Sequence, residues 1–515
     1  MSSSDRYDVL ILGTGAGGGT LLHSLAPTGK KILVLERGDF LPREKENWDS
    51  RAVFRDLRYT ADERWLDAEG QAYRPETHYY VGGNTKLYGA ALLRFRVEDF
   101  RELRHHGGIS PAWPVQYDEF EPYYTQAESL YHVHGRAGVD PIEPPRSAGY
   151  AHAAVTHEPR IQALHDDLVA LGHRPFPLPV GVILDETRPQ HSQCIRCDTC
   201  DGFPCLVHAK ADAEVLCVRP ALTRDNVTLI TNARADRLLT NASGTAVDGV
   251  VAEIDGRMRE FHADVVIVAA GAINSAAMLL RSKSGAHPHG LGNRHDLVGR
   301  HYMRHNNSAF VALSPTINHS RFQKTLALND FYFGAPDFAH PLGHIQTMGK
   351  ADAGKFAVAS PMPLPRGFLH RLATHSLDFW VTSEDLPDAS NRIRLAADGR
   401  IQTEYRENNL EPHDRLNAKL KSLLGRIDRR HGRMQRSLCM RKKIPIKGTT
   451  HQCGTLRFGD DPTTSVLDRN CKVHDVANLY VVDASFFPSS AAMNPALTII
   501  ANALRVGDHL RGVLR

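Results

Sequence analysis

The feature that most constrains the fold is a short apolar segment that runs into a glycine-rich turn near the N-terminus. Residues 9–12 are Val-Leu-Ile-Leu, and Gly13, Gly15 and Gly18 follow with G-x-G-x-x-G spacing. Such a run ending in glycine is typical of a buried parallel strand. The first glycine permits a tight turn, the second lets the backbone approach a pyrophosphate, and the third lets a helix pack on the strand. The pattern predicts a strand–turn–helix unit that binds phosphate at the start of the helix.

An acidic residue follows the next predicted strand. Residues 31–35 are mainly apolar, and Glu36 comes directly after them. A carboxylate at this distance from the glycines can accept hydrogen bonds from the ribose hydroxyls of a dinucleotide. It would repel a 2′-phosphate, so NADP is disfavoured and FAD and NAD remain. An α/β turn without phosphate is the alternative, but strand, glycines, helix, strand and acidic residue occur in the required order.

Several later segments have the composition expected of the same parallel-sheet domain. Residues 227–231 and 250–254 are predicted as strands. Residues 264–271 are predicted as a buried strand that ends in small residues, with a helix after it to Leu280. A last strand is predicted at 479–482 and a helix at about 495–510, where Pro495 suits the first turn. The dinucleotide-binding domain is therefore expected to be discontinuous in sequence.

Bulk properties exclude several classes of function. A net charge of +4 on 515 residues leaves no basic footprint for nucleic acid. The short basic cluster at residues 441–443 is better explained by a solvated face. Residues 1–7 lack the apolar core of a secretion signal, and no later apolar stretch is long enough to cross a bilayer. A cytoplasmic protein without a membrane span is expected.

Two C-terminal side chains are candidates for chemistry at the dinucleotide. His451 begins the segment His-Gln-Cys-Gly-Thr, and Asn494 stands directly before Pro495. A neutral imidazole can accept a proton near neutral pH, and a side-chain amide can donate a hydrogen bond to an oxygen that gains charge. The chain has 28 histidines, so only its motif singles out His451. Asn494 has a second explanation, as the cap of the helix that begins at Pro495.

Further motifs in the sequence resemble those of a known family. Residues 36–38 are Glu-Arg-Gly, residues 81–85 Val-Gly-Gly-Asn-Thr, residues 113–117 Trp-Pro-Val-Gln-Tyr, residues 121–124 Glu-Pro-Tyr-Tyr, residues 483–485 Asp-Ala-Ser and residues 494–498 Asn-Pro-Ala-Leu-Thr. Together with His451-x-x-Gly454-Thr455, they make a chain that resembles the glucose–methanol–choline (GMC) family of FAD-dependent oxidoreductases over most of its length. The C-terminal motifs are the more specific part of this resemblance.

The resemblance implies oxidation of an alcohol to a carbonyl, with hydride transfer to flavin N5. By position, His451 matches the family's active-site histidine, and Asn494 falls where the partner is a second histidine or an asparagine. The chain is thus similar to the His/Asn branch, which includes pyranose oxidases, glycoside 3-oxidases and cholesterol oxidases. A secondary hydroxyl of a sugar or glycoside, at C2 or C3, is the expected target. Steroid, cyclic and aliphatic alcohols are alternatives, and the electron acceptor is dioxygen or an external redox carrier.

The resemblance also implies where FAD binds. In many pyranose oxidases a histidine of the second glycine-rich segment is tethered to the flavin, whereas residues 85–88 here are Thr-Lys-Leu-Tyr. Non-covalent FAD is therefore expected. The residues expected to bind it are Gly13, Gly15, Gly18, Glu36, Arg37, Gly82, Gly83, Asn84, Ala235, Ala270, Asp483, Ala484, Asn494, Pro495 and Thr498.

The expected fold is α/β, with two closely joined domains because 515 residues exceed one small core. One is a Rossmann-like FAD-binding domain, and the other is an α+β substrate domain whose β-sheet faces the flavin. The FAD-binding domain is assigned residues 1–45, 78–100, 205–300 and 466–515, and the substrate domain residues 46–77, 101–204 and 301–465.

A cysteine-rich segment leaves the cofactor content open. Its candidate metal ligands are Cys194, Cys197, Cys200 and Cys205. Such clustering in a cytoplasmic chain favours metal over disulfides, and either an iron–sulfur cluster or a structural zinc would fit four thiolates. Reduced thiols or disulfides are the alternative. A cluster would favour a dehydrogenase that passes electrons to an external acceptor.

Two other functions remain as hypotheses. An NAD-dependent dehydrogenase would leave the His451, Asp483 and Asn494 motifs without a role. A flavin- or metal-binding electron-transfer protein without turnover would not need His451 and Asn494.

Overall fold

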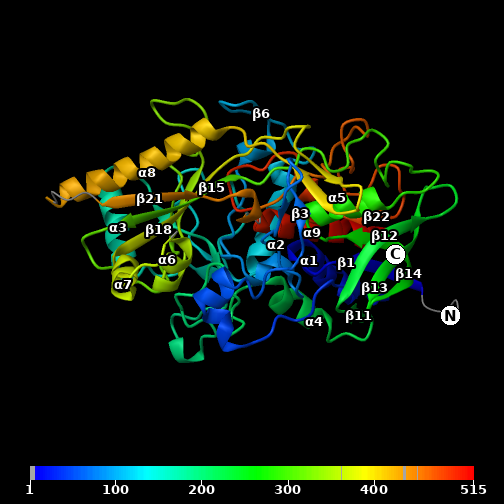
Figure 1. Ribbon diagram of the computed structural model, residues 1–515, viewed down its shortest axis with the longest axis horizontal. Helices are drawn as coiled ribbons and strands as arrows, with labels where there is room; N and C mark the ends of the chain where they lie inside the picture. Colours follow the sequence, from blue (N-terminus) through cyan, green and yellow to red (C-terminus); the bar gives the residue numbers. More distant parts are fainter. Residues whose placement is uncertain (1–5, 361, 433–436, 449–450) are drawn as a thin grey trace.

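The computed structural model describes residues 6–360, 362–432, 437–448 and 451–515. Two β-sheets lie toward opposite ends of its long axis, with β1, β13 and β14 on the right and β15, β18 and β21 on the left of Figure 1. Helix α9 lies between them in this view, and the C-terminus lies toward the right-hand end. The α/β fold class is confirmed by these mixed helices and strands.

The right-hand sheet has seven strands and joins both ends of the chain to its middle. Its order is β11 (Val227–Ile230), β2 (Ile32–Leu35), β1 (Arg6–Leu12), β14 (Arg257–Val268), β13 (Val247–Ile254) and β12 (Ala233–Thr240), with β22 (Leu479–Val481) beside the second half of β14. Strands β11, β2, β1, β14 and β22 pair in parallel, whereas β12, β13 and β14 pair in antiparallel fashion.

Burial explains why these segments form the centre of the molecule. Residues 9–12 and 32–35 are fully buried, as expected for strands covered on both faces. Helix α1 (Ala16–Leu25) packs against α9 (Ala496–Val513), and α5 (Ala272–Arg281) packs against β12. The predicted strands, the helix after residue 271 and the C-terminal helix are all present, and all but the strand predicted at 264–271 lie within a few residues of their expected positions.

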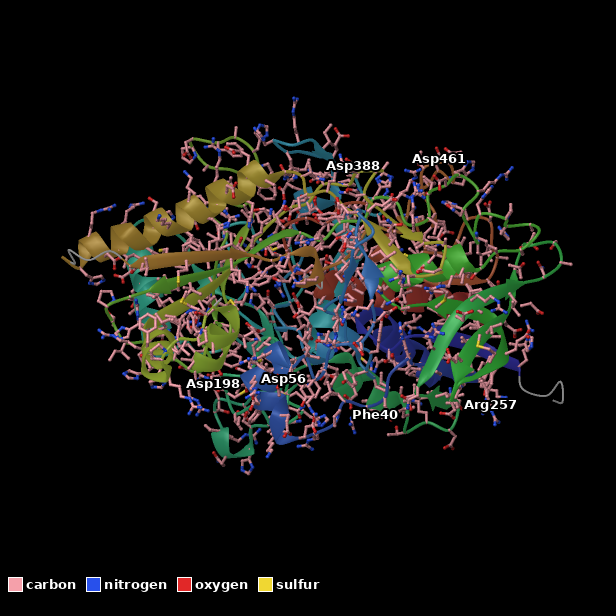
Figure 2. The ribbon with its side chains drawn as sticks, viewed as in Figure 1. Phe40, Asp56, Asp198, Arg257, Asp388 and Asp461 are labelled. Atoms are coloured by element: carbon pink, nitrogen blue, oxygen red, sulfur yellow. The ribbon has the colours of Figure 1, made fainter. Side chains whose placement is uncertain are left out.

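One predicted boundary is wrong. The strand predicted at 264–271 ends at Val268 and begins much earlier, at Arg257. Residues 269–271 instead form the turn into α5, where Gly271 has a φ of +86°. The first half of β14 pairs with β13 and is largely exposed, so it lacks the apolar pattern of a buried strand. Figure 2 shows Arg257 at the periphery of the molecule.

The second sheet is antiparallel and comes mainly from the region after residue 300. Its order is β21 (Leu438–Lys443), β15 (Asn306–Leu313), β18 (Ser376–Ser383), β17 (His344–Thr347), β16 (Leu326–Leu328) and β9 (Phe176–Pro177). Helix α8 (Leu410–Arg430) packs on β15 and β18 through an apolar stripe that includes Leu416, Leu420 and Leu424. The assignment of residue ranges to two domains stays a prediction.

The remaining elements form small sheets and helices outside these two large sheets. They are β3 (Trp65–Leu66), β4 (Ala72–Tyr73), β5 (Leu103–Arg104), β6 (Ile109–Ser110), β7 (Val133–Gly135), β8 (His152–Ala153), β10 (Val180–Gly181), β19 (Arg392–Leu395) and β20 (Ile401–Glu404), with helices α2 (Tyr117–Leu130), α3 (Pro159–Ala170), α4 (Arg219–Ala221), α6 (Ala353–Ala359) and α7 (Arg366–His375). Within the described ranges, the helices fall short of the length and apolarity that crossing a membrane requires.

Candidate active site

A cavity lies between the glycine-rich turn after β1 and the loop before α9. Segments far apart in sequence form its wall, and eleven of the residues predicted for the site line it: Gly13, Gly15, Glu36, Gly83, Asn84, Ala270, His451, Asp483, Ala484, Asn494 and Pro495. The fold thus brings the N-terminal glycines and both candidate catalytic side chains to one space.

The other five predicted FAD residues do not line this cavity. Arg37 and Ala235 line a smaller recess that shares Gly13, Tyr79 and Ala270 with it. Gly18, Gly82 and Thr498 line neither space, and the Thr498 and Tyr124 hydroxyls share a hydrogen bond of 2.8 Å. For all sixteen predicted residues, the role in binding or catalysis stays a prediction.

The glycines of the first turn meet different steric demands. Gly13 has a φ of +99°, which favours glycine, and its N–H donates to Leu35 O at 2.8 Å. A Cβ on Gly18 would lie 2.1 Å from Gly13 O, so a side chain is excluded there. A Cβ on Gly15 would meet no protein atom within 4 Å, because this residue borders the cavity. Open space beside the N-terminus of α1 fits the phosphate group that the motif predicts.

Gly17 is a requirement that the sequence analysis missed. A Cβ there would lie only 2.0 Å from Val482 O, so helix α1 can approach the end of β22 only with glycine at this position. The run of glycines at residues 17–19 was the available sequence signal. It could not show what Gly17 contacts, because Val482 lies hundreds of residues away in sequence.

Glu36 lines the cavity, and its carboxylate also accepts hydrogen bonds from protein groups. Its Oε2 accepts from Thr14 N at 2.9 Å and Thr14 Oγ1 at 2.5 Å, and its Oε1 accepts from Gly38 N at 3.1 Å. Burial raises the pKa of Glu36, while these donors oppose the rise. Thr14 Oγ1 also accepts from Gly82 N at 3.0 Å. Thr14, another residue that the sequence analysis missed, therefore connects the two glycine-rich segments.

The second glycine-rich segment packs directly on the first. Gly83 begins the short helix Gly83–Lys86 with a φ of +54°, and a Cβ on it would lie 3.0 Å from Gly15 Cα. Beneath this segment, the buried Lys86 Nζ pairs with Asp212 Oδ2 at 2.9 Å and with the carboxylate of Glu214. The ion pairs fix the loop that borders the cavity.

Asp483 joins the end of β22 to the start of α5. Its Oδ2 accepts from Gly271 N at 3.0 Å and Ser275 Oγ at 2.5 Å, and its Oδ1 accepts from Ser485 N at 2.9 Å. Burial raises the pKa of this carboxyl group against these hydrogen bonds. Asp483 therefore holds two turns of the cavity wall in place.

His451 is half-buried, lines the cavity and contacts a second histidine. Its Nδ1 lies 3.1 Å from His305 Nδ1, and His305 Nε2 lies 2.8 Å from Ser490 O. Burial lowers the pKa of His451 to about 3, with His305 adding to the shift. The imidazole of His451 is therefore neutral at neutral pH, the form that accepts a proton. The sequence analysis did not select His305, because it stands outside the motif that singled out His451.

Asn494 also lines the cavity, and Pro495 rather than Asn494 is the N-cap residue of the following helix. Helix α9 begins at Ala496, with Pro495 as its N-cap residue and no side-chain capping hydrogen bond. The loop before Asn494 is anchored by buried hydrogen bonds from Trp113 Nε1 to Ser489 Oγ at 2.8 Å and from Ala492 N to Tyr332 Oη at 3.1 Å. The amide of Asn494 thus lies on a fixed loop beside the cavity.

The four candidate metal-ligating cysteines do not form a metal site here. All are free thiols, with Cys194 and Cys200 buried and Cys197 and Cys205 partly buried. Throughout the described ranges, no three or more histidine, cysteine or acidic side chains gather as metal ligands would. Asp198, within the segment, lies at the lower surface in Figure 2. The metal hypothesis stays an untested prediction.

The fold and the cavity together define a class of protein. A Rossmann-type sheet, a glycine turn that leaves space for phosphate, a buried acidic residue after the second strand, and a neutral histidine and an amide in one cavity are the parts of a dinucleotide-dependent oxidoreductase.

Comparison with known proteins identifies the family within this class. The N-terminal part of the GMC oxidoreductase family matches residues 7–306 and its C-terminal part residues 413–503. Paromamine 6′-oxidase of Streptomyces fradiae is 31% identical over 99% of this chain and 92% of its own length. The 2-methyl-1,2-propanediol dehydrogenase of Mycolicibacterium austroafricanum is 27% identical over 99% of this chain and 96% of its own. The chain belongs to the GMC oxidoreductase family.

A solved structure shows the same fold. Pyridoxine 4-oxidase from Mesorbium loti superposes with a TM-score of 0.67 at 19% identity, over 98% of this chain and 99% of that chain. Family membership decides for FAD over NAD, and for an enzyme that acts on CH–OH groups over a non-catalytic carrier.

Proposed function

We propose that this enzyme oxidises a hydroxyl group of a sugar or glycoside, with His451 as the proton acceptor and Asn494 as the hydrogen-bond donor to the substrate oxygen. The observation that carries the proposal is the shared cavity: His451 and Asn494 line the same space as Gly15 and Glu36. A substrate held there would lie beside both side chains and beside the dinucleotide site.

His451 takes the hydroxyl proton. Alcohol oxidation removes this proton and a hydride from the attached carbon, and bound FAD supplies the hydride acceptor. The side chain is kept neutral by burial, and its Nδ1 is engaged with His305, so Nε2 is the nitrogen left for the substrate. A base positioned in this way contributes about 10²–10⁴-fold to a rate.

Asn494 stabilises the oxygen as that proton leaves. Because Pro495 rather than Asn494 is the N-cap residue of α9, the amide N–H groups of Asn494 remain available to the cavity. A fixed donor aimed at developing negative charge is worth roughly 10²–10³-fold in rate. The N-terminal end of α9, at Pro495 and Ala496, adds the positive end of a helix dipole to the same wall.

Glu36 and the first glycine turn bind the dinucleotide part of FAD without a covalent bond. His78 also lines the cavity, and its Nδ1 lies 2.8 Å from Tyr59 O. Acid precipitation tests this part of the proposal, because non-covalent FAD stays in the supernatant. Yellow colour in the pellet would contradict it and would make His78 the first residue to examine for a link.

The relatives favour a sugar-like substrate and leave a second candidate. The similarity to paromamine 6′-oxidase supports a sugar or glycoside, and the 6′-hydroxyl is the first position to test, before C2 and C3. The similarity to 2-methyl-1,2-propanediol dehydrogenase supports a small non-sugar alcohol as the alternative. The electron acceptor is dioxygen or an external redox carrier, and the rate of reoxidation in air distinguishes the two.

The proposal is tested by anaerobic absorption spectroscopy of the FAD-loaded enzyme. Paromamine, an alkyl glucoside and 2-methyl-1,2-propanediol are added separately. Bleaching of the flavin by one of the sugars is expected, and product analysis then gives the oxidised position. Bleaching by the diol alone would move the function to the second candidate.

Variants of the two side chains test their roles in the same assay. His451→Ala and Asn494→Ala should keep FAD and lose most of the rate of flavin reduction. His474→Ala is the matched control, because His474 bonds Ser465 Oγ at 2.9 Å and does not line the cavity. Flavin reduction at the wild-type rate in His451→Ala would overturn the assignment of the base.

A further inference from the structure

We infer that His305 is a positioning residue that holds His451 in the tautomer whose Nε2 carries no hydrogen. The inference rests on the proposed role of His451 as the base. It assigns a function to a buried histidine that does not itself line the cavity but contacts His451, which does.

The first step concerns the hydrogen on His305. Its Nε2 lies 2.8 Å from the carbonyl oxygen of Ser490. A carbonyl oxygen has no hydrogen to give, so the hydrogen of this bond must belong to His305 Nε2. Ser490 is itself held, because its hydroxyl donates to Asp385 O at 3.0 Å.

The second step transfers this constraint to His451. The His305 side chain is almost fully buried at 1% exposure, and burial lowers its pKa, so the ring is neutral. A neutral imidazole with a hydrogen on Nε2 has a bare Nδ1. This Nδ1 lies 3.1 Å from His451 Nδ1, and two bare nitrogens cannot form a hydrogen bond. His451 must therefore carry its hydrogen on Nδ1, and its Nε2 is bare.

The geometry of the pair supports a directed hydrogen bond rather than stacking. The two rings meet at an interplanar angle of 88° with their centroids 5.2 Å apart. His305 has a φ of +63°, which is uncommon outside glycine. Its backbone is fixed on both sides, by Arg304 N donating to Asp385 Oδ2 at 3.1 Å and by Asn306 Nδ2 donating to Glu384 O at 3.3 Å. The strained residue is held in place by its neighbours.

The charged groups around the pair do not supply a competing partner. Glu384 favours a protonated His305, but its carboxylate is already engaged by His105 Nε2 at 3.0 Å and by the Ser110 hydroxyl. Asp385 accepts from Tyr405 Oη at 3.0 Å and from the backbone of residue 304. His451 therefore donates its hydrogen bond to a neutral imidazole rather than to a carboxylate. When Nε2 takes the substrate proton, the Nδ1–H bond to His305 remains in place.

Two variants separate positioning from simple packing. His305→Asn keeps an oxygen acceptor near the place of Nδ1, and asparagine tolerates a positive φ. His305→Leu removes the acceptor. With FAD content unchanged, His305→Leu should slow flavin reduction by at least about 10-fold, whereas His305→Asn should retain most of the rate. Equal losses in both variants would indicate a packing role and overturn the inference.

A spectroscopic readout tests the tautomer without relying on turnover. Nitrogen-15 NMR of histidine-labelled holoenzyme distinguishes Nδ1–H, Nε2–H and charged rings, and His451→Gln assigns the signals of His451. The wild type should show the Nδ1–H form between about pH 6 and pH 8, and His305→Leu should lose it. An Nε2–H form in the wild type would overturn the inference. Failure of every alcohol to bleach the flavin would instead count against the proposed function and leave this measurement decisive.

Discussion

At the scale of single residues, the cavity wall is held by buried polar groups with defined partners. Glu36 and Asp483 accept hydrogen bonds from backbone and hydroxyl donors, which offset the cost of burying a carboxylate. Among the described residues, His451 has another imidazole as its hydrogen-bond partner. The acidic residues therefore shape the site, while the histidine keeps a nitrogen free for chemistry.

The protonation of His451 leads to a prediction about pH. Because burial lowers its pKa to about 3, the neutral base persists to more acidic pH than an exposed histidine would allow. The rate of flavin reduction by saturating substrate should be constant between about pH 6 and pH 8 and fall only on further acidification. Stopped-flow absorption measures it. A decline centred near the ordinary histidine pKa, absent in His451→Ala, would contradict the lowered value.

At the scale of elements, close backbone crossings decide where glycine is required. Helix α1 approaches the carbonyl of Val482 at Gly17. The backbone at Gly38 approaches that of Tyr79 so closely that a Cβ on Gly38 would lie 1.8 Å from Tyr79 O. Gly15, in the same turn as Gly17, has open space instead. Neighbouring glycines thus serve either packing or ligand binding.

This difference predicts opposite effects for two alanine variants. Gly17→Ala forces a Cβ to within 2.0 Å of a backbone oxygen, so it should destabilise the apoprotein by several degrees in Tm. Gly15→Ala should leave apoprotein stability unchanged and weaken FAD binding, because its methyl group projects into the cavity. Thermal unfolding of apoprotein and titration with FAD measure the two effects. Equal loss of stability in both variants would contradict this division.

The cysteine-rich segment gives a second prediction at this scale. Since the described part of the chain has no group of three or more side chains arranged as metal ligands, anaerobically purified protein should contain iron and zinc far below one atom per chain. Elemental analysis by mass spectrometry measures this content, with a Cys194→Ser/Cys200→Ser variant as the control. Several iron atoms per wild-type chain, lost in the variant, would restore the cluster hypothesis.

At the scale of the whole molecule, burial shifts the pKa values of many titratable groups. Burial lowers the pKa values of a set of histidines to about 3 or 4: His78, His157, His301, His344, His413 and His451. It raises those of three carboxyl groups to about 7: Glu76, Asp99 and Asp385. The two sets act on stability with opposite signs.

The balance of these sets predicts sensitivity to acid. Below its ordinary pKa of about 6.5, each such histidine binds a proton in the unfolded chain but not in the folded one, so stability falls as pH falls. The three carboxyl groups bind protons in the folded state first, so their contribution rises as pH falls. The histidines outnumber them, and Tm should drop by several degrees between about pH 7 and pH 5. A constant or rising Tm in calorimetry of the holoenzyme would contradict this balance.

Local patterns were sufficient for the parts of the fold that are buried on both faces. Residues 9–12, 32–35 and 479–482 have continuous apolar runs, and each was predicted as a strand of the observed sheet. The first half of β14 was missed because residues 257–262 pair along an exposed hairpin, where no apolar run is needed. A strand that is buried on both faces needs a continuous apolar run, which can be recognised in the sequence. A strand that pairs along an exposed hairpin needs no such run, so its sequence pattern is weak.

For the site, the sequence by itself determined the glycine turn, the acidic residue after the second strand and the His451 and Asn494 motifs. Each of these is a demand on one short stretch of backbone or on one side-chain type. Tertiary structure alone decided that Gly17 must clear Val482, that Thr14 connects Glu36 to Gly82, and that His305 is the histidine beside His451. These contacts depend on distances between segments remote in sequence, which only the packing of the two sheets sets.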